Sequence, residues 1–358
     1  MPARSGRFPT VTPISGRGSL GSVCSLTRTT IGLVRRSERL AQAVFWLGVV
    51  AAVGMLVVLI MGARVTTTGS AQGCGRDWPL CNGKLIPDFT LAAAIEFSHR
   101  AVTGVEGVLI VAFTVAVLAL YRHHRPIQVL APLMLGFLLL QAGMGAWAVM
   151  YPQAPVVLAL HFGISLIALA TTTLTALYVR RPGAMLAAPA VSGGLRLATW
   201  GGAVYLYVLV YSGAYVRHVG AAAACTSWPL CGGAGAPLGV DAVAVDLVHR
   251  FAAGAALALG IGLLVAYRRA APARRDLEVG AWLLVATLVA QAGAGAFLVL
   301  SSFGLTAELL HSALTGVTFT AIAYLCLLVT LGAREAAGAT AQPPGRDTRR
   351  PAPVGRGA

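Results

Sequence analysis

Long apolar segments separated by short polar connections dominate the chain. Eight of them approach or exceed the roughly 20 residues that an α-helix needs to cross the hydrocarbon layer, and they lie at about 41–63, 93–120, 127–150, 156–179, 197–216, 243–267, 277–300 and 305–331. The composition agrees, since 57% of the residues are hydrophobic and only 11% are charged, far from a soluble globular mixture. The sequence therefore predicts an all-α membrane protein with eight transmembrane helices in the lipid bilayer.

The second half of the chain repeats the first at an offset of 150 residues. This offset maps Trp78-Pro79-Leu80-Cys81 onto Trp228-Pro229-Leu230-Cys231, and Gln141-Ala142-Gly143 onto Gln291-Ala292-Gly293. An internal duplication of this length fixes the architecture. We expect two tandem, pseudo-symmetric four-helix bundles over 41–179 and 197–331, joined by a cytoplasmic linker over 180–196.

The distribution of basic residues indicates the topology. Of the 27 Lys and Arg residues, six lie on one side of the predicted spans, and the other 21 share the opposite side with both termini. By the positive-inside rule the basic side is cytoplasmic. The net charge of +15 does not indicate nucleic-acid binding, because the basic residues do not gather on one face with interleaved aromatic residues.

Both ends of the chain are polar and basic. Residues 1–40 are rich in Ser, Gly and Arg with the single acid Glu38, and we expect a disordered cytoplasmic arm. A transit peptide is the alternative, but the topology explains the charge without import, so we expect the cell (plasma) membrane. Residues 332–358 are rich in Pro, Gly and Arg and are expected to form a disordered cytoplasmic tail.

Four histidines occupy matching places in the repeat. The interval from the first to the second is 62 residues, and so is the interval from the third to the fourth: His99, His161, His249 and His311. In the predicted topology all four lie roughly 8–10 Å below the outer surface, at 1.5 Å per helical residue. Two imidazoles facing each other at one level in each bundle would supply the axial ligands of a bis-histidine haem.

Other interpretations of these histidines are weaker. A single buried histidine is more often a hydrogen-bonded core residue, but four with duplicated spacing favour haem. Zinc is disfavoured because two histidines on separate helices lack the further ligands that zinc requires. His123 and His124 lie in a basic turn and are expected to be solvated, and His218 has no repeat partner and no assigned role.

Two further pairs of polar residues accompany the histidines. Arg100 and Arg250 directly follow a histidine on the outer side, and we expect each to pair with a haem propionate, since a guanidinium offers a bidentate fork to carboxylates. Snorkelling to lipid headgroups is the alternative. Gln141 and Gln291 each lie in a QAGxGA sequence and could bond a haem substituent or a neighbouring helix, while the glycines are expected to let helices pack closely.

Each of the two longest outer connections, about 64–92 and 217–242, holds two cysteines: Cys74 with Cys81, and Cys225 with Cys231. An oxidising exterior permits disulfides, and closing so short a loop contributes about 2–3 kcal/mol in the chain-entropy model. We expect structural staples that hold a lid over each haem, with thiol exchange during a reaction as the alternative. Cys326 lies within an apolar segment and is interpreted as a small apolar residue.

The two halves differ in the carboxylate that precedes the first histidine by three residues. It is Glu96 in the first half and the shorter Asp246 in the second, and residues three apart share a helix face. A longer carboxylate reaching one macrocycle would suit chemistry on that macrocycle, whereas two equivalent haems would suit a di-haem membrane cytochrome that only passes electrons. A transporter fits poorly, because the segments lack paired mid-span proline breaks.

The eight-segment plan, the EFSHR and DLVHR sequences, the later histidines and the two Cys…Trp-Pro-Leu-Cys loops together resemble the haem A synthase family over about residues 40–331. The resemblance implies that His99 and His161 bracket the substrate haem O, and that His249 and His311 ligate a tightly bound haem b. It places the family's essential glutamate at Glu96 and its cysteine pair at Cys74 and Cys81. It implies no role for Asp246.

The activity that the resemblance implies is oxidation of one porphyrin methyl group of haem O to a formyl group by two successive hydroxylations, which gives haem A for cytochrome oxidases. We expect Glu96 to accept a proton or to stabilise positive charge near that methyl group. The expected partners are a haem O synthase that delivers the substrate and an electron acceptor in the membrane. The sequence is also compatible with a homo-oligomer.

Overall fold

The computed structural model describes residues 20–88, 90–151, 155–231 and 239–340 of the 358-residue chain. The chain divides into two units, residues 1–43 and 44–358. All side chains discussed below belong to the second unit. Its described residues form helices and loops, with a single isolated bridge between Cys81 and Lys84.

The described helices run as follows: α1 (Leu20–Thr67), α2 (Leu91–Tyr121), α3 (Arg125–Met150), α4 (Pro155–Arg180), α5 (Pro182–Leu186), α6 (Gly193–His218), the 3₁₀ helix η1 (Ala221–Ala224), α7 (Gly239–Ala270), α8 (Arg275–Leu300) and α9 (Leu305–Thr340). Eight of them contain a segment long and apolar enough to cross a membrane. The predicted all-α class with eight transmembrane helices is thereby confirmed.

Several helices extend beyond the predicted segments. Helix α1 begins at Leu20, so residues 20–40, for which disorder was expected, are helical in the structure. No proline occurs between Pro13 and Pro79 to stop this helix. Helix α9 continues to Thr340 through an alanine-rich stretch, and the expected linker contains the short helix α5. The remaining parts of the two predicted termini, 1–19 and 341–358, lie outside the described residues.

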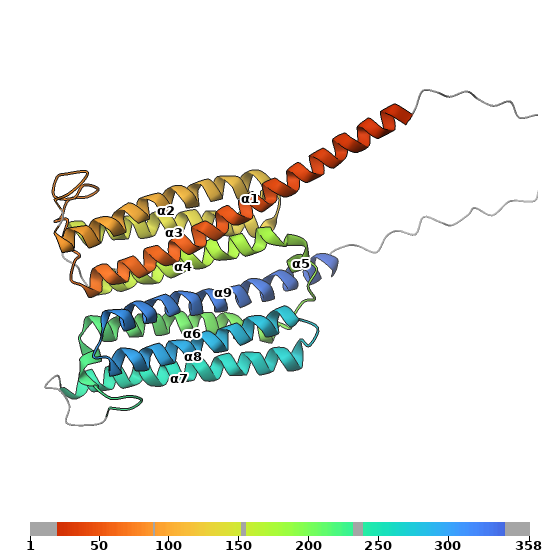
Figure 1. Ribbon diagram of the computed structural model, residues 1–358. Helices are drawn as coiled ribbons and strands as arrows, with labels where there is room; N and C mark the ends of the chain where they lie inside the picture. Colours follow the sequence, from red (N-terminus) through yellow and green to blue (C-terminus); the bar gives the residue numbers. More distant parts are fainter. Residues whose placement is uncertain (1–19, 89, 152–154, 232–238, 341–358) are drawn as a thin grey trace, which may run out of the picture. The chain divides into compact units, whose positions relative to one another are not determined.

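The transmembrane helices of the second unit lie roughly along one direction (Figure 1). Helices α2, α3 and α4 pack together with the part of α1 after residue 43, helices α6 to α9 pack together, and α4 also contacts α6 and α9. Phe319 and Met185 pack against the buried cores of both halves. Because the halves share side chains, the division into two separate bundles stays a prediction.

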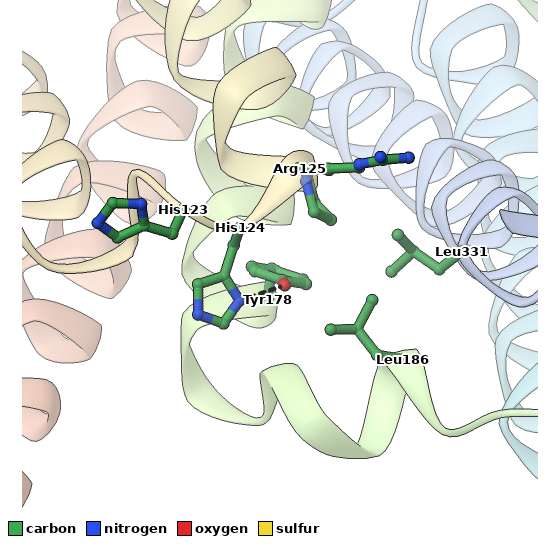
Figure 2. Close-up of a pocket in the computed structure, with 7 residues that line it drawn as sticks. His123, His124, Arg125, Tyr178, Leu186 and Leu331 are labelled. Atoms are coloured by element: carbon green, nitrogen blue, oxygen red, sulfur yellow. Dashed lines mark hydrogen bonds between the residues drawn. The ribbon is translucent and has the colours of Figure 1, made fainter. Parts of the chain in front are cut away.

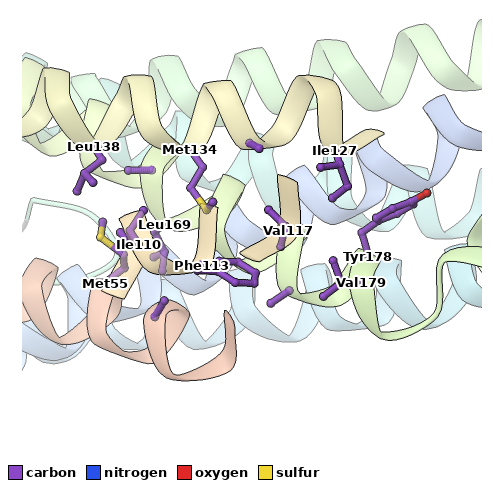
Figure 3. Close-up of a cluster of buried hydrophobic side chains, with 14 of the residues drawn as sticks. Met55, Ile110, Phe113, Val117, Ile127, Met134, Leu138, Leu169, Tyr178 and Val179 are labelled. Atoms are coloured by element: carbon purple, nitrogen blue, oxygen red, sulfur yellow. The ribbon is translucent and has the colours of Figure 1, made fainter. Parts of the chain in front are cut away.

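Large apolar side chains fill the core of the first half (Figure 3). Met55 of α1, Phe113 of α2, Met134 of α3 and Leu169 of α4 are buried in one cluster. Val108, on the other face of α2, is 70% exposed, as expected for a side chain that faces lipid. Helices associate in lipid through close packing rather than through the hydrophobic effect. The packing of these side chains therefore determines which face of each helix points inward.

Short polar signals set where the helices begin and end. Thr90 caps α2 by accepting a hydrogen bond from the Ala93 N–H at 3.2 Å, and this start sets the register of the functional residues that follow. Gly69 and Gly220 follow α1 and α6 with φ of 65° and 71°, a left-handed conformation that favours glycine. The two outer loops thus leave their helices in the same way, as the repeat predicts.

Candidate functional site

The four histidines lie on four different helices and approach one another in the predicted pairs. His99 of α2 interacts electrostatically with His161 of α4, and His311 of α9 interacts with His249 of α7. Each pair therefore lies within one half of the chain.

Each imidazole packs against a glycine of the helix that precedes its own. A Cβ atom placed on Gly62 would lie 3.3 Å from Cε1 of His99, and one on Gly145 would lie 3.3 Å from Cε1 of His161. In the second half, a Cβ atom on Gly213 would lie 2.9 Å from Cε1 of His249, and one on Gly295 would lie 3.6 Å from Cε1 of His311. The absence of a side chain lets each ring lie against the backbone of the neighbouring helix, which limits its rotation. The packing role expected for the QAGxGA glycines agrees with Gly145 and Gly295, whereas Gly62 and Gly213 were not singled out from the sequence.

The ring nitrogens are suited to binding a further group. Nδ1 of His99, His161 and His311 is buried without a partner among the described residues, and Nδ1 of His249 pairs with Oγ of Ser212 at 2.8 Å. A hydrogen bond at one ring nitrogen orients the other toward a metal. Three buried imidazole nitrogens without a partner among the described residues, together with a fourth ring that a hydrogen bond orients, fit a bis-histidine haem in each half.

The two glutamines differ between the halves. Nε2 of Gln291 lies 3.1 Å from Nε2 of His311 and 2.8 Å from Oγ1 of Thr315. The equivalent Gln141 is buried, with its Nε2 3.7 Å from Sδ of Met55 and its Oε1 without a partner among the described residues. The side chain of Gln291 therefore contacts a histidine, whereas the side chain of Gln141 contacts a core methionine.

Glu96 connects α2 to the first outer loop. Its side chain is 3% exposed, Oε2 accepts a hydrogen bond from the Cys74 N–H at 2.8 Å, and Oε1 accepts one from Arg100 Nη2 at 2.5 Å. Nη1 of Arg100 also donates to the carbonyl oxygens of Asp77 and Leu80 at 2.8 and 2.7 Å. A buried carboxylate paired in this way is held firmly in position.

The second half repeats this arrangement with a shorter acid. Nη2 of Arg250 forms an ion pair with Asp246 at 2.7 Å, and Nη1 donates to the carbonyl oxygens of Ser227 and Pro229 at 2.6 and 3.2 Å. Among the described contacts, Asp246 receives no backbone N–H from its loop, in contrast to Glu96. The sequence assigned no role to Asp246. In the structure it pairs with Arg250.

The arginines hold the loops as well as the acids. A propionate partner for Arg100 and Arg250 stays a prediction, since their guanidinium groups bond loop carbonyls and the acid one helical turn earlier. Each loop is closed by a disulfide, Cys74–Cys81 with Cα atoms 4.3 Å apart and Cys225–Cys231 with Cα atoms 4.9 Å apart. The loops are therefore fixed both covalently and by an arginine. Cys326 is a buried free cysteine.

A polar cluster that the sequence analysis missed lies at the outer helix ends. Nη2 of Arg217 in α6 donates to Oγ1 of Thr67 in α1 at 2.7 Å and to Oε2 of Glu308 in α9 at 3.0 Å, and Thr67 also donates to Glu308. Glu308 precedes His311 by three residues, the same spacing as Glu96 and His99. That spacing was the signal that could have identified it.

The opposite ends of the helices hold a pocket of about 330 Å³, which His124, Tyr178 and Leu331 help to line (Figure 2). His123 is exposed, as expected for a solvated residue. The same expectation was wrong for His124, which is half-buried and shares a 2.9 Å hydrogen bond with the Tyr178 hydroxyl, because α4 brings that hydroxyl beside the turn. His218 ends α6, and its side chain lies outside the described part of the structure.

Comparison with known proteins supports one family. Residues 87–323 match the model of the COX15-CtaA family, described as cytochrome oxidase assembly protein. The chain is 39% identical over 295 residues to a protein named Heme A synthase from Symbiobacterium thermophilum, covering 80% of this chain and 95% of that protein. It is 38% identical over 272 residues to a Heme A synthase from Exiguobacterium sibiricum (76% and 90% covered), and 37% identical over 293 residues to one from Shouchella clausii (79% and 96% covered).

Proposed function

The chain belongs to the COX15-CtaA family of cytochrome oxidase assembly proteins, and we infer that it is a haem A synthase that oxidises a methyl group of haem O to a formyl group. The observation that carries this proposal is the combination of two matched histidine pairs with a buried, firmly held carboxylate, Glu96, beside the first pair. A di-haem cytochrome that only passes electrons would need the histidines but not the difference between Glu96 and Asp246.

The two halves have different roles in this proposal. His99 and His161 hold the substrate haem O, and His249 and His311 hold a resident haem b, which supplies redox chemistry when bound. The glycine opposite each imidazole limits rotation of the ring, and the loop closed by Cys74–Cys81 shields the substrate site from water. Arg100 holds this loop to α2.

Glu96 acts near the methyl group that is oxidised. Its carboxylate is fixed by the Cys74 N–H and by Arg100, so its position does not depend on flexible solvent contacts. We propose that it accepts a proton or stabilises positive charge during hydroxylation, the common roles of a positioned carboxylate. Among the described residues, Asp246 pairs with Arg250 and receives no backbone N–H from its loop, a difference from Glu96 that supports chemistry in the first half.

The membrane setting follows from the same proposal. In this proposal both termini lie in the cytoplasm and the loops with the disulfides face outward, which the distribution of basic residues supports. The protein resides in the plasma membrane. A haem O synthase delivers the substrate, and a membrane electron acceptor removes the electrons released by the oxidation.

Pigment extraction tests the function. Protein purified in detergent from cells that make haem O should yield haem b together with haem O or haem A, identified by chromatography and mass spectrometry. The reason is that the two halves hold different macrocycles. A single haem type, with no haem A formed by cells that express the protein, would support the electron carrier instead.

Enlarging the glycine beside His249 should disturb the second haem. Gly213→Ala places a methyl group 2.9 Å from Cε1 of the ring, closer than side chains normally approach, so the imidazole must rotate. We expect a shifted electron paramagnetic resonance signal of the second-half haem and an affinity lowered roughly tenfold, the scale of a perturbed ligand orientation. Gly295→Ala is the matched control, because its Cβ would lie at an ordinary 3.6 Å from His311. Equal spectra for both variants would contradict the assignment of His249 as a ligand.

A further inference from the structure

Glu106 is a buried acid in the middle of α2 that the mechanism above does not use. Its side chain is 3% exposed, and its Oε1 has no partner among the described residues. Ionisable groups at this depth of a membrane protein are costly and usually serve a function. Gly54 of α1 makes room for it, since a Cβ atom at Gly54 would overlap with Oε2 of Glu106.

The helix places Glu106 directly below the first histidine pair. Residues seven apart lie on nearly the same face of an α-helix, about 10 Å apart along its axis, so Glu106 lies two turns deeper in the membrane than His99. Thr103 lies between them on the same face and donates to the His99 carbonyl at 2.8 Å. The carboxyl group, which lies beside Gly54 of α1, would therefore be below the inner edge of a macrocycle held at the level of His99.

The second half has no acid at this place. The repeat offset of 150 maps Glu106 onto Ala256, which is 1% exposed. Between α1 and α6 the repeat offset is 151 residues, since Gly62-Ala63 aligns with Gly213-Ala214. This offset maps Gly54 onto Tyr205. Tyr205 extends to α7 and donates to the Ala252 carbonyl at 2.8 Å. The first half thus pairs a glycine with an acid where the second pairs a tyrosine with an alanine.

The chemistry of the two macrocycles differs at the same edge. Haem propionates are charged and favour a polar environment, so in a haem bound with its propionates at the outer end the opposite edge would face the membrane interior. In haem O this edge carries a hydroxyethylfarnesyl group with one hydroxyl, whereas haem b carries a vinyl group there. A buried hydroxyl without a hydrogen-bond partner is costly.

We propose that Glu106 hydrogen-bonds the hydroxyl group of the hydroxyethylfarnesyl substituent and makes the first half selective for haem O over haem b. A carboxyl group can accept this bond, and in its protonated form it can also donate one. In the second half Ala256 offers no polar group to the vinyl group of haem b, and the nearby Tyr205 hydroxyl already bonds the Ala252 carbonyl. The inference rests on the proposed function and adds a specificity-determining residue to it.

Binding of the two haems to the full-length protein tests this proposal. Protein stripped of haem in the first half is titrated with haem O and with haem b in detergent, and the Soret band gives both affinities. Glu106→Ala should weaken haem O binding about tenfold, the value of one hydrogen bond, and leave haem b binding unchanged. Glu106→Gln should retain most of the preference, because its amide group can still bond a hydroxyl.

Controls separate this effect from a general loss of structure. Thr114→Val removes another buried polar group from the same face of α2, one that bonds only its own helix at the Ile110 carbonyl (2.7 Å), and should leave the preference intact. Haem retained in the second half reports folding. The inference would be overturned if Glu106→Ala weakened the binding of haem O and haem b equally, or left the ratio of the two affinities unchanged. If the wild-type protein still formed haem A, the proposed function would stand. A wild-type protein that neither binds haem O nor forms haem A overturns both.

Discussion

Alanine at His311 should deprive the second half of its haem. The imidazole is one of two proposed axial ligands, and changes in groups that merely support a metal ligand already lower affinity about 10- to 100-fold, so loss of the ligand itself should exceed 100-fold. Purified His311→Ala protein should therefore lack the low-spin absorption bands of the resident haem, measured by reduced-minus-oxidised difference spectra. His249→Ala should give the same result, because the two residues act on one iron.

His123→Ala is the matched control for this experiment. His123 is exposed in the turn between α2 and α3 and lies at the opposite ends of the helices from the four histidines, so its replacement should leave every haem band in place. Unaltered bands in His311→Ala would remove that histidine from the ligand set and, with it, the pairing on which the functional proposal depends.

Shortening or removing the Glu96 side chain should stop haem A formation while both haem sites remain. General acid–base groups contribute about 10²- to 10⁴-fold to a rate, so Glu96→Ala should lower haem A formation by at least about 100-fold, measured by chromatography of extracted haems. Haem b content should stay near the wild-type value, because Glu96 lies in the first half. Asp88→Asn is the control, since Asp88 is an exposed acid of the same loop, paired only with Lys84.

Glu96→Asp separates position from charge. The second half shows that an aspartate can pair with the arginine one turn later, as Asp246 does with Arg250. The aspartate variant should therefore keep the contact with Arg100 and the closed loop, yet withdraw the carboxylate by one methylene group from the substrate. Wild-type haem A yield in both variants would show that Glu96 serves the loop alone.

The sequence was sufficient to identify the eight membrane-spanning segments and the pairing of the histidines. Membrane spans are recognised from the length of apolar segments, a local property, and the repeated interval between His99 and His161 identified their common depth. The contacts of Arg100 could not be predicted, because the loop carbonyls that it bonds belong to residues 20 and 23 positions earlier. Only the folded loop brings them within reach.

Glu106 shows a different limit. The acid is visible in the sequence inside an apolar segment, but the sequence analysis did not single it out. Nothing local distinguishes it from an acid that faces a neighbouring helix. Its significance depends on Gly54, 52 positions earlier, which leaves space beside the carboxyl group. Gly62 and Gly213 were missed for the same reason, since close approach of two helices is a property of the pair of helices.

The contacts among Thr67, Arg217 and Glu308 bear on how such a duplicated chain came to be. The repeat counterparts of Arg217 and Glu308 are Thr66 and Leu158, so the first half cannot form the same ion pair. An ancestral dimer of identical halves would have had to make this contact twice or not at all. After fusion, the two copies were free to acquire side chains that only one of them needs, and from that point neither could replace the other.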